Sequence, residues 1–154
     1  MMNRNKGFTL VEILIVVIIL GILAAIVIPQ FTEASEDARN SALSSDLQTL
    51  RSQLELYKFQ HNDKYPWDVL TTPATDNTTF WTQMMSKTTP DGSTTSGTFG
   101  PYVQSKPANP FVSGTAGQEV TIGVVANPGT SGKGWYIDNV GDKISAGDSV
   151  HSGF

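Results

Sequence analysis

The fold of this chain is decided by residues 6–12, Lys6-Gly7-Phe8-Thr9-Leu10-Val11-Glu12, and by the apolar run at residues 13–28 that follows them. At a rise of about 1.5 Å per residue, residues 8–28 form roughly 30 Å of helix, enough to cross the hydrocarbon core of a bilayer. Glu12 interrupts this stretch with a carboxylate, which costs about 2.5–3.5 kcal/mol inside a membrane. A residue that costs so much is expected to have a specific role.

Two ordinary interpretations of such a stretch are a cleaved secretory signal and a plain membrane anchor. A cleaved signal carries a small-residue A-x-A site after its apolar run, and no such pattern lies near Ala24, Ala25 or Ala34. The chain contains no cysteine, which excludes attachment of a lipid to a cysteine side chain. A plain uncleaved anchor stays open as an alternative, but it gives Glu12 no role.

Residues 6–12 resemble the class III signal of type IV pilins and type II secretion pseudopilins. In that family a prepilin peptidase cuts after the glycine and methylates the new N-terminus. The resemblance therefore implies cleavage between Gly7 and Phe8 and N-methylation of Phe8. It also matches Glu12 to the glutamate that the family carries near the start of its mature chain, which implies a role in assembly. Pro29 matches the family's proline at the end of the apolar segment.

The composition limits the head domain and its partners. The chain has 154 residues, of which 39% are hydrophobic, and much of that fraction lies in the first 30 residues. One small domain is therefore expected beside the apolar segment. The net charge is −4, and loss of the leader, residues 1–7, removes Arg4 and Lys6 and leaves a more acidic chain. This charge argues against nucleic acid as a partner.

The charges that flank the apolar run predict its orientation. Arg4 and Lys6 precede the run, whereas three acidic side chains follow it within residues 33–37. The positive-inside rule then places the N-terminus in the cytoplasm. We expect a single-pass inner-membrane protein with a periplasmic head domain, residues 30–154, which moves into a periplasmic or extracellular filament after assembly.

One long helix is predicted from about Thr9 to about Gln60. Its first half, the transmembrane or filament-core segment at residues 8–29, is apolar all round. Its second half carries a stripe of apolar residues spaced mostly three or four apart, including Leu43, Leu47, Leu50, Leu54 and Tyr57. Pro29 removes one backbone hydrogen bond, so the helix is expected to be bent or weakened between Gly21 and Pro29. A helix that ends at Pro29 is the alternative.

The C-terminal third of the chain carries a pattern of short strands. The strand candidates are residues 120–126, 134–138 and 143–146, with turns at 127–129 and 139–142. They predict a small antiparallel β-sheet whose apolar face packs on Leu47, Leu50 and Leu54. The predicted fold is α+β and pilin-like, with a long N-terminal helix packed on this sheet.

No catalytic constellation is found in the sequence, so an enzyme is not expected. His61 is interpreted as a helix-end or turn residue and not as a ligand or base, and His151 has no companion cluster. The one metal candidate is the group Asp138, Asp142 and Asp148, because calcium takes several oxygen ligands, often carboxylates. The resemblance supports calcium, since major pseudopilins bind it in their C-terminal loop, but these aspartates are more widely spread. Solvated turn aspartates are the alternative, and no other cofactor is expected.

The resemblance implies a filament subunit. Residues 8–28 then have two apolar environments, the bilayer and the core of a helical bundle of identical subunits. The implied partners are further copies of the chain, the prepilin peptidase, an inner-membrane platform protein, minor pseudopilins and a cytoplasmic ATPase. The stretches at residues 47–66 and 100–111 resemble major, G-type pseudopilins and favour a type II secretion pseudopilus that drives protein export. The alternatives are a type IV pilin for adhesion, motility or DNA uptake, and a membrane-anchored binding module that never polymerises.

Overall fold

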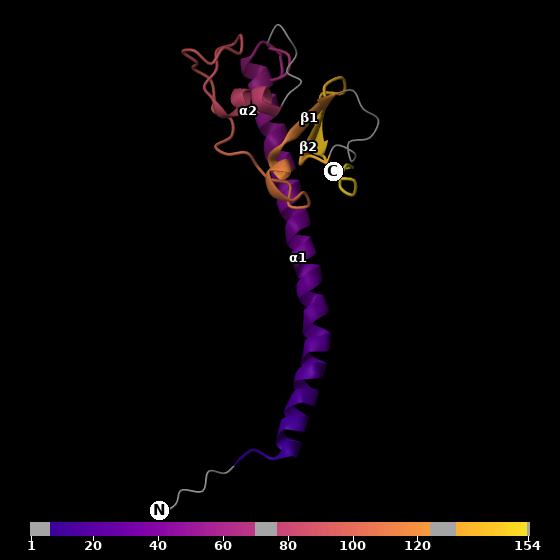
Figure 1. Cartoon of the computed structure of the whole chain (residues 1–154). Helices are drawn as coiled ribbons and strands as arrows, with labels where there is room; N and C mark the ends of the chain where they lie inside the picture. Colours follow the sequence, from indigo (N-terminus) through magenta and orange to yellow (C-terminus); the bar gives the residue numbers. More distant parts are fainter. Residues whose placement is uncertain (1–6, 70–76, 124–131, 154) are drawn as a thin grey trace, which may run out of the picture. The chain divides into compact units, whose positions relative to one another are not determined.

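The structure, a computed structural model, describes residues 7–69, 77–123 and 132–153. Its elements in chain order are α1 (Leu10–Gln60), α2 (Asn77–Met85), the short 3₁₀ helix η1 (Gly114–Gln118), β1 (Val120–Gly123), β2 (Trp135–Asp138) and β3 (Lys143–Ala146) (Figure 1). The chain forms two compact units, Met1–Ala38 and Arg39–Phe154. Most of the expected leader, residues 124–126 of the first expected strand and the expected turn at residues 127–129 lie outside the described residues.

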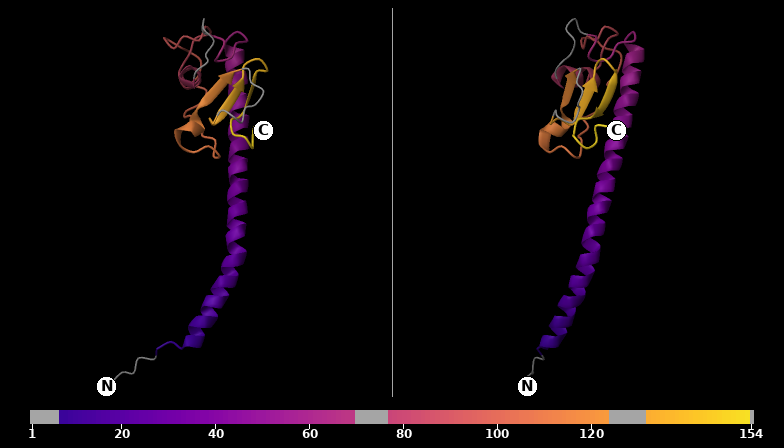
Figure 2. Two further views of the ribbon diagram at one scale, coloured as in Figure 1. Left: turned by 45° about the vertical axis from the view of Figure 1, so that its right-hand side comes forward. Right: turned by 90° about the vertical axis from the view of Figure 1, so that its right-hand side faces the viewer.

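The long helix predicted from the sequence is confirmed by α1, which both views of Figure 2 show as a continuous ribbon. Pro29 lies inside α1, so the helix does not end there. The bend expected between Gly21 and Pro29 stays a prediction. After Gln60 the backbone turns through Asn62 and Asp63, with φ of 55° and 65°. These two residue types adopt the left-handed region more readily than most, which explains why the helix ends here.

The division into compact units falls after Ala38, whereas the boundary expected from the sequence falls after Pro29. The two boundaries describe different properties of α1. The sequence boundary marks where the apolar run ends, and the division after Ala38 marks where residues begin to contact the C-terminal fold. Residues 1–38 are called the N-terminal unit and residues 39–154 the C-terminal unit.

The sheet has the strand order β1-β2-β3. β2 and β3 are antiparallel, with Ile137 opposite Ile144, as expected. The expected antiparallel pairing of β1 is wrong, because β1 runs parallel to β2 with Val120 opposite Trp135. A short turn such as residues 139–142 forces antiparallel strands, but the longer connection from Gly123 to Trp135 lets the chain cross back before it pairs. The α+β fold class is confirmed with a mixed sheet.

The core of the C-terminal unit lies between α1, α2 and the sheet. The residues of α1 that it buries are Leu43, Leu47, Leu50, Leu54 and Tyr57. The sheet residues in the same cluster are Val120, Ile122, Trp135, Ile137, Ile144 and Ala146. The predicted packing of the leucine stripe against the sheet is therefore confirmed. α2 adds Phe80, Trp81 and Met84, and the indole N–H of Trp81 donates to the Gln118 carbonyl at 2.8 Å.

Candidate functional site

The N-terminal unit exposes its apolar side chains all round the helix. Phe8 is 84% exposed, Ile18 54% and Ile28 65%. The most apolar 18-residue window of α1 has a mean hydropathy of 3.3 and buries none of its residues, so the helix is long and apolar enough to cross a membrane. An apolar surface of this extent needs a cover of lipid or protein. The N-terminal unit thus fits a single-pass membrane anchor.

Glu12 lies in the first turn of α1 and caps the helix together with Thr9. The backbone N–H and the hydroxyl of Thr9 each donate to Glu12 Oε2 at 2.8 Å, and the Glu12 N–H donates back to the Thr9 hydroxyl oxygen at 3.3 Å. This reciprocal pattern is a capping box. The interpretation of the sequence missed it, although Thr9 and Glu12 have the spacing that identifies such a box.

The capping box leaves the Glu12 carboxylate able to meet a cation. A carboxylate offers about four lone-pair positions, and the two strong bonds from Thr9 both reach the same oxygen, Oε2. The nitrogen of Phe8 is part of a peptide bond in the uncut chain. Cleavage after Gly7 would turn it into an amine with a reference pKa of about 7.7–8.0, which is largely charged at neutral pH. Glu12 can therefore cap the helix and receive such an amine.

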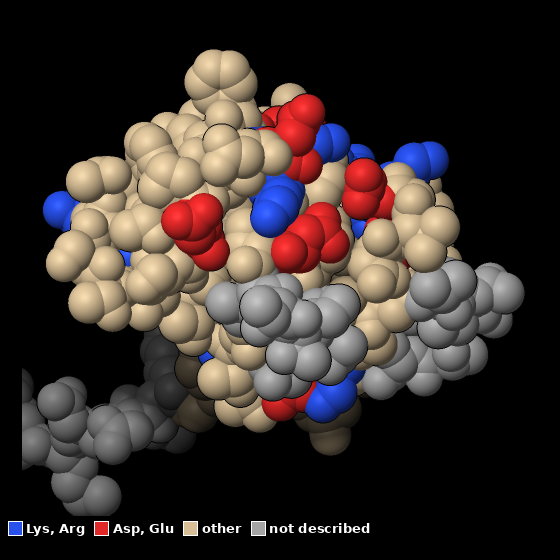
Figure 3. All heavy atoms as spheres, turned by 90° about the horizontal axis from the view of Figure 1, so that it is seen from above, with Lys and Arg blue, Asp and Glu red and all other residues tan. Residues whose placement is uncertain are grey.

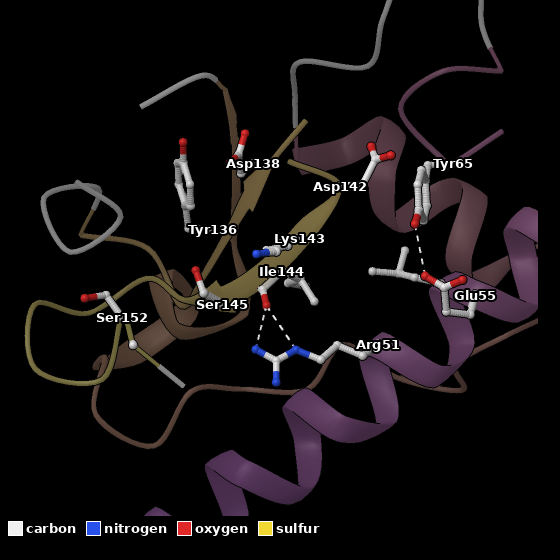
Figure 4. A pocket seen from close by; sticks show the side chains of 12 residues that line it. Arg51, Glu55, Tyr65, Tyr136, Asp138, Asp142, Lys143, Ile144, Ser145 and Ser152 are labelled. Carbon is white, nitrogen blue, oxygen red and sulfur yellow. Dashed lines mark hydrogen bonds between the residues drawn. The ribbon is translucent and has the colours of Figure 1, made fainter. Parts of the chain in front are cut away.

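The C-terminal unit contains a pocket of about 680 Å³ between α1 and β3 (Figure 4). Leu54 and Ile144 give it an apolar floor, and its charged lining includes Arg51, Glu55 and Lys143. Arg51 donates from Nε and Nη2 to the Ile144 carbonyl at 3.3 Å and 3.0 Å. Glu55 accepts a hydrogen bond from the phenol of Tyr65 at 3.0 Å. Arg51 thus joins α1 to β3, and Glu55 joins α1 to the segment at Tyr65. Both side chains have a structural role.

The charges on the surface of the C-terminal unit are mixed in sign. On the face seen from above in Figure 3, acidic and basic side chains lie next to one another among uncharged residues. A nucleic-acid site is expected to show a basic patch or stripe instead. This face therefore has no such footprint, in agreement with the acidic composition of the chain.

Two of the three aspartates considered for calcium lie at the β2–β3 turn. The Asp138 carboxylate accepts the N–H groups of Val140 at 3.0 Å and Gly141 at 3.1 Å, and these bonds hold the pKa of Asp138 below its usual value. Asp142 has a φ of 51° and lines the pocket. Asp138 thus stabilises the turn that joins the two strands.

The third aspartate, Asp148, holds the C-terminal segment. Its Oδ2 accepts from the Asn109 amide at 2.8 Å, and its Oδ1 lies 2.7 Å from Nδ1 of His151. Burial raises the pKa of Asp148, but these bonds outweigh it and lower the pKa overall. Within residues 7–69, 77–123 and 132–153, no three acidic, histidine or cysteine side chains gather as a metal-binding group. The structure does not unite the three aspartates, and calcium stays a prediction.

His61 lies in the turn directly after α1, as expected, and its side chain is buried in the core. Its Nδ1 lies 2.9 Å from the Tyr57 carbonyl oxygen and its Nε2 lies 2.9 Å from the Thr88 hydroxyl. Its ring stacks on Tyr57 with 3.7 Å between centroids. Burial lowers the pKa of His61, against the opposing effect of its hydrogen bonds. These contacts give His61 a structural role at the end of α1.

The first part of the chain is similar to known proteins. Residues 2–28 match the prokaryotic N-terminal methylation motif. The resemblance to type IV pilins and pseudopilins is confirmed. The chain is 44% identical over 66 residues to the type II secretion system core protein G of Dickeya chrysanthemi, and 41% identical over 64 residues to that of Pseudomonas aeruginosa. A protein of the same name from Vibrio cholerae is 40% identical over 65 residues.

The similarity extends over part of each chain. The match to the Dickeya protein covers 43% of this chain and 42% of that relative, and the match to the Pseudomonas protein covers 42% and 44%. The chain thus spans less than half the length of the relatives that it matches. No solved structure matches it significantly.

Proposed function

We propose that this chain is a structural subunit of a type II secretion pseudopilus, which polymerises through the apolar half of α1 to drive protein export. The observation that carries the proposal is the exposed apolar surface at residues 8–28, on a chain whose C-terminal unit already has a core of its own. The methylation motif and the similarity to core protein G support it. No catalytic role is part of the proposal.

In this proposal the apolar half of α1 has two alternative covers. Before assembly it crosses the inner membrane, with the N-terminus in the cytoplasm and the head domain in the periplasm. During assembly it exchanges lipid for the same segment of other copies, so the free energy of apolar burial is largely preserved and assembly can be reversed. The partners are copies of the chain, the prepilin peptidase, a platform protein of the inner membrane and minor pseudopilins.

Processing gives the first test of this proposal. Intact-mass analysis of the membrane form is expected to show a chain that begins at Phe8 and carries one additional methyl group. The control is the same chain in cells without prepilin peptidase, where the mass is expected to include residues 1–7. A membrane form that retains Met1 in cells with the peptidase would contradict the proposal.

The role of Glu12 in assembly is the second part of the proposal. In the uncut chain Glu12 caps α1 with Thr9, and after cleavage its carboxylate receives the amine of Phe8 from its own chain or from an incoming copy. Glu12→Ala is expected to leave cleavage and membrane insertion intact but to reduce the yield of pelletable filaments strongly. Glu12→Gln shows whether a polar group without charge is sufficient.

The capping box supplies a matched control for Glu12. Thr9→Val removes the hydroxyl bond to Glu12 Oε2 and the return bond from the Glu12 N–H, but it keeps the carboxylate. If Glu12 acts in assembly through its charge, Thr9→Val retains most of its filaments while Glu12→Ala does not. Equal loss in the two variants would show that helix capping, and not a meeting with an amine, accounts for the effect.

A surface pilus remains the second candidate, because the matched motif at residues 2–28 names only the methylation step and no secretion system. Deletion of the chain's gene separates the two functions. A pseudopilus subunit is needed for export of folded proteins, so the exported proteins are expected to accumulate in the periplasm. Normal export with loss of surface filaments would favour the pilus.

A further inference from the structure

The three-stranded sheet has two open edges among the described residues, one on β1 and one on β3. An open edge presents unpaired backbone N–H and C=O groups, to which a strand of another chain can pair. The direction of each backbone group follows from the pairing of the strands. In an antiparallel pair, residues that exchange both hydrogen bonds alternate with residues whose backbone groups point away from the partner strand.

On β3 the residues whose backbone groups point outward are Ile144 and, by the same alternation, Ala146. Gly147, just beyond the strand, donates its N–H to the Gly134 carbonyl at 2.9 Å, and the alternation along β3 then directs the backbone groups of Ile144 away from β2. Arg51 of α1 meets this outward carbonyl with two N–H groups at 3.3 Å and 3.0 Å. A side chain from the helix thus takes one of the acceptors that a neighbouring strand would use.

The pocket of about 680 Å³ follows this same edge. Its lining includes Tyr136 and Ser145, which lie opposite each other in the β2–β3 register, and also Arg51 and Glu55 of α1 (Figure 4). The pocket therefore lies beside β3, between this strand and α1, and it also reaches Tyr136 of β2. An extended strand of another chain would occupy this space beside β3.

On β1 the N–H of Val120 is one of the groups that point away from β2. The Glu119 carbonyl accepts the Trp135 N–H at 3.0 Å and so points toward β2. The two polar groups of a trans peptide point in opposite directions, so the N–H of Val120 points away from the sheet. Asn77, the first residue of α2, accepts this N–H through Oδ1 at 3.0 Å. The second edge thus also has a side-chain cap supplied by a helix.

We propose that Arg51 and Asn77 are edge caps, which prevent the sheet of one copy from pairing with the sheet of a second copy. Each cap occupies a backbone group that a strand from another chain would need, and each comes from a helix held by the core. The inference goes beyond the proposed function and does not depend on it. The partner that the caps exclude is a second copy of this chain.

The test uses the absence of cysteine in the sequence. Ser145→Cys places a reporter on β3 in the full chain, purified in detergent micelles and oxidised over a range of concentrations. Adding Arg51→Met keeps an unbranched apolar side chain but removes the guanidinium, and it is expected to raise the yield of disulfide-linked dimer several-fold. Arg39→Met is the matched control, since it removes an exposed arginine of the same helix away from β3.

The β1 edge gives an independent arm of the same experiment. With Thr121→Cys as the reporter, Asn77→Leu is expected to raise the dimer yield, whereas Asn77→Asp keeps an acceptor for the Val120 N–H and is expected to restore the low yield. Tryptophan emission and the melting temperature identify variants that stay folded. If one capping variant unfolds, the arm on the other edge decides. Folded variants that dimerise no more than their controls would overturn the proposal.

Discussion

The N-terminal and C-terminal units of this chain differ in the exposure of their apolar side chains. In the N-terminal unit Ile19 is 51% exposed and its neighbours are similar, whereas in the C-terminal unit Leu43, Tyr57 and Ile137 are fully buried. Both patterns occur along the same helix, α1. Apolar residues of α1 are thus exposed throughout the N-terminal unit, whereas in the C-terminal unit those of the core-facing stripe are buried and Leu56 and Phe59, outside the stripe, stay exposed.

Removal of the apolar half of α1 is expected to have the largest effect, a change in solubility without loss of the C-terminal fold. A fragment that begins at Phe31 keeps the buried stripe of α1 and loses residues 8–28. It is expected to be soluble without detergent and monomeric, and to unfold cooperatively, because the core of the C-terminal unit is retained. Gel filtration and thermal unfolding by circular dichroism check the outcome. Aggregation, or the absence of a cooperative transition, would show that the C-terminal unit does not fold by itself.

Two substitutions of buried and exposed apolar residues compare how much each unit contributes to the stability of the C-terminal unit. Leu50 is 1% exposed, so Leu50→Ala is expected to lower the free energy of unfolding of the C-terminal unit by about 2–5 kcal/mol through lost burial and a cavity. Ile19→Ala is the matched change in the N-terminal unit and is expected to leave that free energy unchanged. Denaturant titration of the two full-length variants in detergent checks the difference. Equal destabilisation would contradict the assignment of the two roles.

The polar contacts that hold the C-terminal segment are expected to have a smaller effect. Asn109 is 1% exposed and donates to Asp148 at 2.8 Å and to the Gly134 carbonyl at 3.0 Å. Asn109→Ala leaves these acceptors without their donor, at a cost of about 1–3 kcal/mol. Hydrogen exchange is expected to accelerate at the amides of Val150 and His151. Unchanged protection at these amides would show that the segment is held by other contacts.

The pH dependence of stability is expected to show the smallest effect, through His61. Burial lowers the folded-state pKa of His61 below its ordinary value of 6.5, so the unfolded state takes up the proton first. Stability is then intact above about pH 6.5 and is lost progressively as the pH falls from 6.5 toward the folded-state pKa, by about 1.4 kcal/mol for each unit between the two values.

A substitution isolates this contribution from the titration of other groups. His61→Phe keeps a ring that can stack on Tyr57 but does not titrate. Its melting temperature is expected to be lower than that of the wild type at pH 7, because the bond to the Thr88 hydroxyl is lost, but to vary less below pH 6.5. Parallel pH profiles of the two proteins would exclude His61 as the source of the dependence.

The sequence predicted the elements that rest on a periodic pattern. The spacing of Leu43, Leu47 and Leu50 predicted the buried face of α1, because tertiary packing of an amphipathic helix follows directly from side-chain period. The α+β fold was predicted for the same reason. The direction of β1 was not predicted, since the side-chain pattern of a short strand is the same in either direction and its long connection does not decide between them.

The candidate site was predicted less completely than the fold. The roles of Gly7, Phe8 and Glu12 were assigned by resemblance and stay predictions. The capping box was not predicted, although Thr9 and Glu12 carry its spacing. The roles of Asp148 and His61 depend on partners far away in the chain, Asn109 and Thr88, which no local pattern indicates. The aspartates considered for calcium were grouped by their closeness in sequence, and the structure uses Asp138 and Asp148 in separate hydrogen-bond networks.

The most direct test of the account is whether the apolar half of α1 is covered by other copies of the chain. A scan of single cysteines over residues 13–28 in the cysteine-free chain, oxidised in membranes of assembling cells, reports contacts between neighbouring copies. Disulfide-linked dimers are expected at positions on more than one face of the helix, with a strong decrease in the Glu12→Ala background. Monomers alone at every position, while filaments are present in the same cells, would contradict it.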